Sequence, residues 1–268
     1  MIYNDYLPFK LWSSFCSYLM EVITMTATIK LLSTEQTKAF DTEYVDAKMF
    51  TLVQQALESY SIINKPFTLM DVGGGNGKYA DKFLSCYPNA HVTVLDSEYS
   101  LLEKNTSNQR KNLIHAPFQN VSDIPKMQVI QFNWVLHHFV SSGYKESCAL
   151  QLSGLKDAYE LLEPGGVILI FENFYDGWPM KELPSNIIHQ LTASTSLAAI
   201  TSKMGANTAG VGVCFHSEKY WRNLLSTAGF NQIKSKHCYD FGNLSTLKKI
   251  CLCINEQRVG LLIAQKPI

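Results

Sequence analysis

The sequence has no excess of charge of either sign, because 23 Lys and Arg residues balance 23 Asp and Glu residues in a chain of 268. A neutral chain gives no electrostatic reason to expect nucleic acid as a partner. Internal repeats and low-complexity tracts are also missing. Because 46% of the residues are hydrophobic, the composition instead predicts a chain with a packed core.

Paired cysteines are missing as well. The seven cysteines form no Cys-x-x-Cys pair and no cluster with histidine along the sequence. This spacing predicts neither a disulfide framework nor a metal site. We interpret the cysteines as reduced thiols of a cytoplasmic protein, many of them buried. They stand at Cys16, Cys86, Cys148, Cys214, Cys238, Cys251 and Cys253.

The first 63 residues carry helical patterns rather than strands. The apolar run at residues 11–25 contains Glu21, is too short to span a membrane and lacks a signal-peptide cleavage site. We interpret it as an amphipathic helix that covers a pocket or pairs two chains in a homodimer. Ser33–Gln36 is typical of a capping box, and apolar residues recur every three or four positions from Val45 to Tyr60. Whether this portion is a lid or only covers one face of a sheet stays open.

A glycine-rich turn lies near the middle of the first half of the chain. The apolar run Phe67–Val72 predicts a buried strand, which three consecutive glycines and Gly77 follow, and a helical pattern begins near Lys78. Strand, glycine turn and helix is the geometry in which backbone can approach a nucleotide-like ligand. A second predicted strand at residues 91–95 ends in Asp96, and one carboxylate there can accept both hydroxyls of a ribose.

Two classes of ligand compete for this turn. The dinucleotide fingerprint requires Gly-x-Gly-x-x-Gly. If the motif starts at Gly73, the position of its third glycine is occupied by Lys78. If the motif starts at Gly75, that position is occupied by Ala80, and the two preceding glycines are left unexplained. A nicotinamide-dependent oxidoreductase is therefore the less favoured interpretation.

The other class rests on a resemblance. Residues 71–77, Asp-Val-Gly-Gly-Gly-Asn-Gly, resemble the first motif of the class I S-adenosylmethionine-dependent methyltransferases, acid-x-Gly-x-Gly-x-Gly. Residues 133–138, Asn-Trp-Val-Leu-His-His, resemble the fourth motif of the small-molecule members. Residues 162–166, Leu-Glu-Pro-Gly-Gly, are similar to a recurring feature that precedes the fifth strand. The resemblance covers residues 67–172 by motif and continues to residue 268 by the order of elements.

The pattern predicts an α/β fold with a doubly wound, mostly parallel seven-stranded sheet of the Rossmann-like methyltransferase type. Residues 1–63 form the helical portion, and residues 64–268 form the S-adenosylmethionine-binding domain. The resemblance implies that the seventh strand is antiparallel and that the insertion 173–215 builds the substrate pocket. We expect strands at 67–72, 91–95, 113–116, 127–133, 167–171, 233–239 and 259–265, and helices at 45–60, 78–84, 98–110, 144–162, 187–200, 217–228 and 244–254.

The resemblance implies S-adenosyl-L-methionine as the cofactor and S-adenosyl-L-homocysteine as its product. By this resemblance Asp71 holds the amino group of the cofactor, and Asn133 lines its methionine end. Asp96 accepts hydrogen bonds from the ribose hydroxyls. The amides of Gly73 and Gly75 approach the cofactor, where a side chain would block it.

The expected adenine pocket departs from the family pattern. Methyltransferases commonly place an acid there to hold the adenine amino group, whereas this chain has Pro117. The neighbouring Phe118 either packs against the adenine face or is a core aromatic. Methyl transfer from a sulfonium needs no metal, so we expect no metal ligand.

A general base is suggested by position only. His137 aligns with the catalytic histidine of plant-type O-methyltransferases, whose motif is His-Asp-Trp, but here His138 and Phe139 follow it. We take His137 as the candidate base and His138 and His216 as weaker candidates. Glu172 ends the fifth strand, and whether it faces the pocket, caps a neighbouring element or lies at the surface stays open.

These features favour a methyltransferase that transfers a methyl group in line to a small molecule, on oxygen. Trp134 and Val135 replace the two prolines of enzymes that methylate amines on DNA or protein, which argues against that substrate class. One alternative stays open, in which the protein binds the cofactor but catalyses another rearrangement or only binds it. The identity of the acceptor cannot be derived from the sequence.

Overall fold

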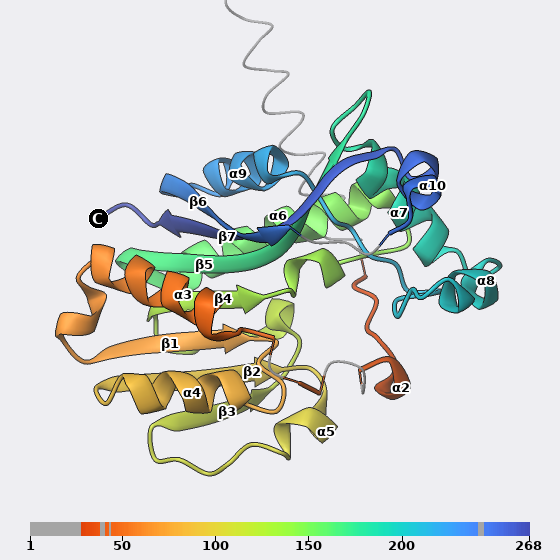
Figure 1. The fold of residues 1–268 in the computed structure, drawn as a ribbon. Coiled ribbons are helices and arrows are strands. Elements are labelled where there is room, and N and C mark those ends of the chain that lie inside the picture. Colours follow the sequence, from red (N-terminus) through yellow and green to blue (C-terminus); the bar gives the residue numbers. More distant parts are fainter. Residues whose placement is uncertain (1–27, 38–40, 43, 241–243) are drawn as a thin grey trace, which may run out of the picture.

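The structure is a computed structural model that describes residues 28–37, 41–42, 44–240 and 244–268. The run at residues 11–25, for which we expected an amphipathic helix, lies outside the described residues, so the expected helix and homodimer stay predictions. Within the described ranges, no helix combines the length and apolarity needed to cross a membrane. Helices lie on both sides of a central sheet (Figure 1).

The sheet has seven strands in the order β3-β2-β1-β4-β5-β7-β6. The first five strands are parallel, and β7 is antiparallel to both β5 and β6, as expected. The chain winds outward in both directions from β1 and β4, so the topological switch point lies between these two strands. The strands are β1 (Phe67–Val72), β2 (Ala90–Asp96), β3 (Lys111–His115), β4 (Met127–Asn133), β5 (Leu162–Gly177), β6 (Asn231–Asp240) and β7 (Ile254–Gln265).

The helices fall into two groups. Helices α3, α4, α6 and α9 flank the sheet, whereas α2, α8 and α10 lie beyond the ends of the parallel strands, on the right in Figure 1. The α-helices are α2 (Thr34–Thr37), α3 (Ala47–Ser59), α4 (Lys78–Cys86), α5 (Tyr99–Leu102), α6 (Tyr144–Leu161), α7 (Leu183–Ala193), α8 (Ala198–Lys203), α9 (Glu218–Thr227) and α10 (Thr246–Cys251). The described residues also contain the short 3-10 helices η2 (Ile62–Asn64), η3 (Phe118–Asn120) and η4 (Leu136–His138).

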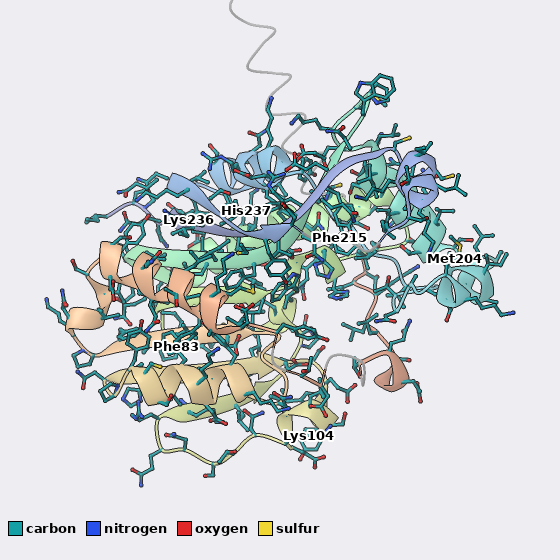
Figure 2. All side chains as sticks on the ribbon, viewed as in Figure 1. Phe83, Lys104, Met204, Phe215, Lys236 and His237 are labelled. Atoms are coloured by element: carbon teal, nitrogen blue, oxygen red, sulfur yellow. The ribbon has the colours of Figure 1, made fainter. Side chains whose placement is uncertain are left out.

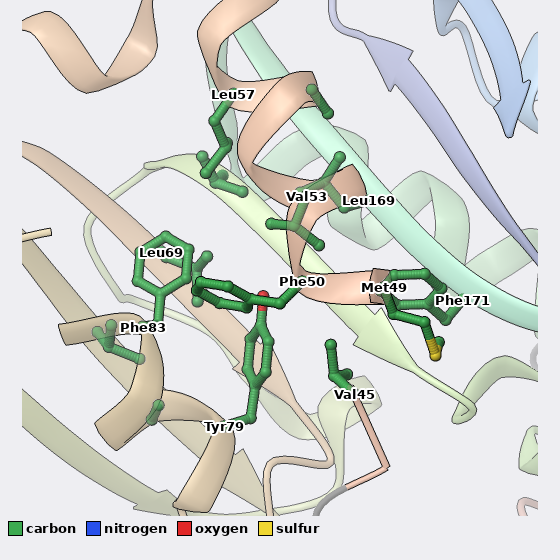
Figure 3. Close-up of a cluster of buried hydrophobic side chains, with 14 of the residues drawn as sticks. Val45, Met49, Phe50, Val53, Leu57, Leu69, Tyr79, Phe83, Leu169 and Phe171 are labelled. Carbon is green, nitrogen blue, oxygen red and sulfur yellow. The ribbon is translucent and has the colours of Figure 1, made fainter. Parts of the chain in front are cut away.

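Both faces of the sheet are buried. Because successive side chains of a strand point to opposite faces, alternate residues of β1 and β4 enter two separate cores. On one face, Phe50 of α3 and Phe83 of α4 pack against Leu69 of β1 (Figure 3). On the other face, Trp221 of α9 belongs to the same core as Ile130 of β4. The two cores hold the carboxyl ends of the parallel strands in fixed positions.

The structure differs from the sequence-based expectation in several elements: β3 and β7 begin earlier than expected, at Lys111 and Ile254, and α10 is shorter than the helix expected at 244–254. Strand β5 extends to Gly177 because it pairs with β7 along that length, so the first five residues of the expected insertion 173–215 are strand. The helix expected at 98–110 is only α5, and the side chain of Asn105 donates to the carbonyls of Leu102 and Gly75 just after it. The helix expected at 187–200 is divided into α7 and α8.

The expected capping box is present at α2. The Ser33 amide donates to Gln36 Oε1 at 3.0 Å, and the Gln36 amide donates to Ser33 Oγ at 3.3 Å. Gln36 Nε2 also donates to the carbonyls of Asn207 and Ala209, at 2.8 and 3.3 Å. These bonds attach the segment before the first strand to the loop after α8.

The helix α3 offers a test of the fold. Asp46 caps its N-terminus, because Asp46 Oδ1 accepts a hydrogen bond from the Met49 amide at 2.8 Å. We expect Asp46→Ala to lower the free energy of unfolding by about 1 kcal/mol, measured by urea denaturation. Asp46→Asn keeps an acceptor and should cost only a fraction of that. Equal losses in the two variants would contradict the capping role.

Candidate functional site

A cavity of about 1320 Å³ lies at the carboxyl ends of β1, β2 and β4. This is the switch point of the sheet, where doubly wound folds bind ligands. Segments before β1 and after β5 also contribute to its walls. The expected cofactor-binding residues and the candidate base line it, namely Asp71, Gly73, Gly75, Asp96, Phe118, Asn133 and His137.

The glycine turn after β1 needs glycine for its conformation and for space. Gly73 and Gly75 have φ angles of 70° and 49°, which L side chains rarely adopt. A Cβ on Gly73 would lie 2.5 Å from Val135 Cγ2. The two amides, which we expected to face a ligand, donate instead to Leu95 O at 2.7 Å and to Asp96 Oδ2 at 2.9 Å. The turn therefore uses its amides to hold the end of β2.

The carboxylate of Asp96 is fixed at the wall of the cavity. Its Oδ2 accepts from the Gly75 amide, and its Oδ1 accepts from the Glu98 amide at 2.8 Å. Burial raises the pKa of Asp96, and the backbone hydrogen bonds from Glu98 and Gly75 oppose this rise. Because each carboxylate oxygen has more than one lone pair, Asp96 can still accept hydrogen bonds from a ligand.

A chain of hydrogen bonds runs along the ends of β4 and β1. The Tyr79 hydroxyl donates to Gln131 Oε1 at 2.6 Å, and Gln131 Nε2 donates to Asn133 Oδ1 at 2.8 Å. Asn133 Nδ2 then donates to Asp71 Oδ1 at 3.2 Å. Asp71 is fully buried. The chain holds the Asp71 carboxylate in place, and sequence reasoning identified only Asp71 and Asn133 of its four members.

A second wall of the cavity is formed by η3. Phe118 is buried and contacts Phe132 and Phe139, with ring centroids 5.3 and 6.2 Å away, so it is a core aromatic that also lines the cavity. Beside it, Gln119 Nε2 is buried and has no hydrogen-bond partner among the described residues. An unpaired buried amide costs about 1–3 kcal/mol. Gln119, which sequence reasoning missed, is therefore a candidate donor to a ligand.

A histidine and a glutamate meet at the end of β4 and β5. Asn133 is in register with Phe171 in these parallel strands, so the residues that follow are neighbours. His137 Nδ1 lies 2.7 Å from Glu172 Oε2, and the His137 amide donates to Glu172 Oε1 at 3.2 Å. Glu172 is fully buried and does not line the cavity, so both a surface position and a position facing the pocket are wrong for it.

This pairing defines the chemistry available to His137. A carboxylate that accepts the Nδ1 proton leaves Nε2 as the unprotonated ring nitrogen. The ring also packs against Phe215, with centroids 4.7 Å apart. His137 can therefore take a proton from a hydroxyl bound in the cavity.

The two weaker histidine candidates lie in different environments. His138 lines the cavity, and burial, with a contribution from His137, places the pKa of His138 well below its usual value. His216 does not line the cavity, because its ring nitrogens face Glu182 at 2.7 Å and Gln151 at 2.8 Å. His137 combines a cavity position with a carboxylate partner, Glu172, at 2.7 Å.

The remaining wall is apolar. Ile188, Val213 and Phe215 line it, together with Met204 at the end of α8. Figure 2 shows Phe215 and Met204 on the side of the sheet toward α8. These residues come from the segment 173–215, for which we expected a pocket.

The chain matches the model of the O-methyltransferase domain family over residues 23–231. It belongs to this family. Its match to curated family members is partial. It is 29% identical to trans-resveratrol di-O-methyltransferase of Vitis vinifera over 129 residues, which cover 47% of this chain and 33% of that protein. It is 24% identical to flavonoid 3'-O-methyltransferase of Chrysosplenium americanum over 179 residues, which cover 67% of this chain and 46% of that protein.

The matched part of the chain thus spans between a third and a half of the length of these relatives. Its fold is also similar to that of phosphoethanolamine N-methyltransferase 2 of Haemonchus contortus, solved in complex with S-adenosyl-L-methionine. The TM-score is 0.56 at 14% sequence identity, and the alignment covers 87% of this chain and 57% of that one. At this identity the likeness shows a shared fold.

Proposed function

We propose that this domain is a cytoplasmic S-adenosyl-L-methionine-dependent methyltransferase that methylates a hydroxyl of a small molecule. The observation that carries the proposal is that His137, held by Glu172, lines the same cavity as the glycine turn and Asp96. Membership of the O-methyltransferase domain family supports it. The apolar wall around Phe215 favours an acceptor with a hydroxyl on an apolar body.

The residues around the glycine turn suit this cofactor. We assign Asp96 to the ribose hydroxyls, because its fixed carboxylate can accept from both. The buried Asp71 suits the amino group of the cofactor, and Asn133, which orients Asp71, lines the methionine end. Gly73 and Gly75 line the same part of the cavity, in positive-φ conformations that L side chains rarely adopt.

We assign the adenine end to the wall formed by η3. Phe118 offers an aromatic surface at the cavity, and Gln119 offers a buried amide that lacks a partner among the described residues. An amide can donate to a ring nitrogen of adenine. Gln119 would thus hold the adenine through a ring nitrogen, whereas the acid that the family commonly places near Pro117 accepts from the adenine amino group.

A substitution at Gln119 tests this assignment with two readouts. We expect Gln119→Leu to weaken binding of S-adenosyl-L-homocysteine about tenfold, measured by calorimetric titration. The same change should raise the unfolding temperature of the ligand-free protein, because it removes an unpaired buried amide. Gln190→Leu, on an exposed side chain that does not line the cavity, is the control. Unchanged affinity in Gln119→Leu would contradict the assignment.

The bound cofactor supplies a methyl group activated by a sulfonium charge, and the protein has to orient the acceptor and exclude water. His137 Nε2 accepts the hydroxyl proton as the acceptor oxygen attacks. Glu172 keeps the other ring proton on Nδ1 and stabilises the imidazolium that forms.

We also propose that residues 1–63 cover the cavity of the catalytic portion, 64–268. In support, Leu31 and Tyr44 line the cavity, and Gln36 attaches α2 to the loop after α8. A cover of this kind would exclude water from the methyl transfer.

The proposed function is tested by incubating the protein with S-adenosyl-L-methionine and a panel of apolar phenols. We expect release of S-adenosyl-L-homocysteine together with a methyl ether of one acceptor, both detected by mass spectrometry. Failure of the protein to bind S-adenosyl-L-homocysteine would overturn the proposal. Binding without transfer to any acceptor would favour a protein that only binds the cofactor.

A further inference from the structure

Two cysteines and a histidine that are far apart in the sequence meet behind the acceptor end of the cavity. The Sγ atoms of Cys148 and Cys214 and a ring nitrogen of His216 all lie within 4.8 Å of one another. Cys214 is buried and Cys148 is partly exposed. None of the three lines the cavity, so the proposed methyl transfer does not use them.

The contacts of His216 favour a proton on each of its ring nitrogens. Gln151 Nε2 donates to the carbonyls of Leu136 and Cys214, at 3.2 and 3.1 Å, which fixes the orientation of its amide. Gln151 Oε1 therefore faces His216 Nε2, at 2.8 Å, and this nitrogen must be a donor. His216 Nδ1 faces the Glu182 carboxylate at 2.7 Å. Ser185 Oγ also lies 3.2 Å from Nδ1. Against the opposing effect of burial, Cys148 and Glu182 raise the pKa of His216, so these contacts favour an imidazolium.

The imidazolium favours a thiolate on Cys148. Hydrogen bonding from the Cys214 thiol, together with His216 and Tyr220, lowers the pKa of Cys148 to about 4 against the opposing effect of burial. Burial, together with the neighbouring Cys148, raises the pKa of Cys214 well above its usual value, so Cys214 keeps its proton. A partly exposed thiolate beside a second thiol is the arrangement of peroxide-sensitive cysteines.

We propose that Cys148 and Cys214 form a peroxide-sensitive pair that closes reversibly to a disulfide. The Cys148 thiolate attacks one oxygen of hydrogen peroxide, so that an S–O bond forms, the O–O bond breaks and hydroxide leaves. The Cys214 sulfur then attacks the Cys148 sulfur, and the S–S bond replaces the S–O bond. The departing hydroxide takes the Cys214 proton. The two sulfurs lose two electrons, and the peroxide is reduced to water and hydroxide.

Closure of this disulfide would act on the candidate base. The Cys214 amide donates to the His137 carbonyl at 3.0 Å, and the adjacent Phe215 packs against the His137 ring. The two sulfurs, now within 4.8 Å, must close to about 2.0 Å. This movement pulls on the segment that supports His137, so we expect slower methyl transfer. That consequence rests on the proposed function, whereas the disulfide itself does not.

The test uses the full chain, first reduced and then exposed to stoichiometric hydrogen peroxide. We expect peptide mapping by mass spectrometry to show a cross-link between Cys148 and Cys214 that dithiothreitol reverses. Cys148→Ser should abolish the cross-link, and Cys86→Ser, at an exposed cysteine elsewhere, should keep it. Cys214→Ser should instead retain a sulfenic acid on Cys148, detected by dimedone labelling. Hydrogen exchange of the amides in residues 213–216 should change on oxidation.

Activity is the second readout. Peroxide should lower methyl transfer several-fold in the wild type and in Cys86→Ser, but not in Cys148→Ser. A cross-link to any other cysteine, or full retention of both thiols, would overturn the proposal. So would one equivalent of zinc in the isolated protein that protects both thiols from peroxide, because the cluster would then hold a metal. If no variant transfers methyl groups, the cross-link and the hydrogen exchange still decide the matter.

Discussion

Replacing His137 by glutamine is expected to lower the rate of methyl transfer by about 10²–10⁴-fold. Glutamine approximates the size of histidine but cannot accept a proton near neutral pH. The substitution should lower the rate of methyl transfer but leave the affinity for the cofactor product unchanged, because His137 is assigned to the acceptor end of the cavity. Initial rates with a phenolic acceptor measure the rate, and calorimetric titration with S-adenosyl-L-homocysteine measures the affinity.

Glu172→Gln is the companion variant for this prediction. The carboxylate of Glu172 accepts two hydrogen bonds from His137, one from the ring and one from the backbone. A glutamine has one acceptor oxygen, so its NH₂ group must face one of these two donors. If it faces Nδ1, the ring proton moves to Nε2 and the base is lost. We expect the rate to fall by about 10²-fold or more, as for other wrong-tautomer substitutions.

His138→Gln is the matched control, since His138 lines the same cavity but has no part in the proposed proton transfer. A folded His137→Gln protein with an unchanged rate would exclude His137 as the base. The acceptor would then have to lose its proton to solvent before the methyl transfer.

The sequence predicted the strands best where an apolar run has clear boundaries. Strands β1 and β4 begin and end at the expected residues. Pro66 and Gly73 bound the first run, and the second follows Lys126 and ends on Asn133. Strand β5 was predicted too short because it carries Glu172, Asn173 and Asp176, which are atypical of a buried strand. Its true length follows from pairing with β7, a contact between distant residues that no local pattern shows.

The candidate site also has residues that the sequence predicted and residues that it did not. A motif along one stretch of chain was enough to bring Asp71 and Asp96 to the cavity. The partner of His137 could not be assigned from the sequence, because Glu172 reaches it only through the register of β4 and β5. The cluster of Cys148, Cys214 and His216 was missed for a related reason. Its members come from separate elements, so no spacing rule for thiol or metal sites applies to them.

Replacing Asp96 by alanine is expected to weaken the binding of S-adenosyl-L-homocysteine by at least about 10²-fold. Two hydrogen bonds from ribose hydroxyls to a carboxylate would be lost, and each contributes roughly 1.5–3 kcal/mol. The substitution also releases the amides of Gly75 and Glu98, which the carboxylate holds. Loss of affinity alone therefore cannot separate a direct contact from a loosened turn.

A product analogue that lacks the ribose 2'-hydroxyl separates these two causes. If Asp96 holds the hydroxyl, removing it should weaken binding to the wild type but not to Asp96→Ala, and the two losses should not add. Asp81→Ala, at an acid of α4 that pairs with Lys111 outside the cavity, should respond to the analogue as the wild type does. Additive losses would mean that Asp96 only shapes the turn.

The pH dependence of binding gives an independent readout of the same contact. Only the ionised carboxyl can accept hydrogen bonds from both hydroxyls. Burial raises the pKa of Asp96. Affinity for S-adenosyl-L-homocysteine should therefore fall as the pH is lowered, beginning at a higher pH than an ordinary aspartate would require. The 2'-deoxy analogue should show a weaker fall, because it has one hydroxyl fewer to lose. Parallel profiles for the two ligands would place the 2'-hydroxyl away from Asp96.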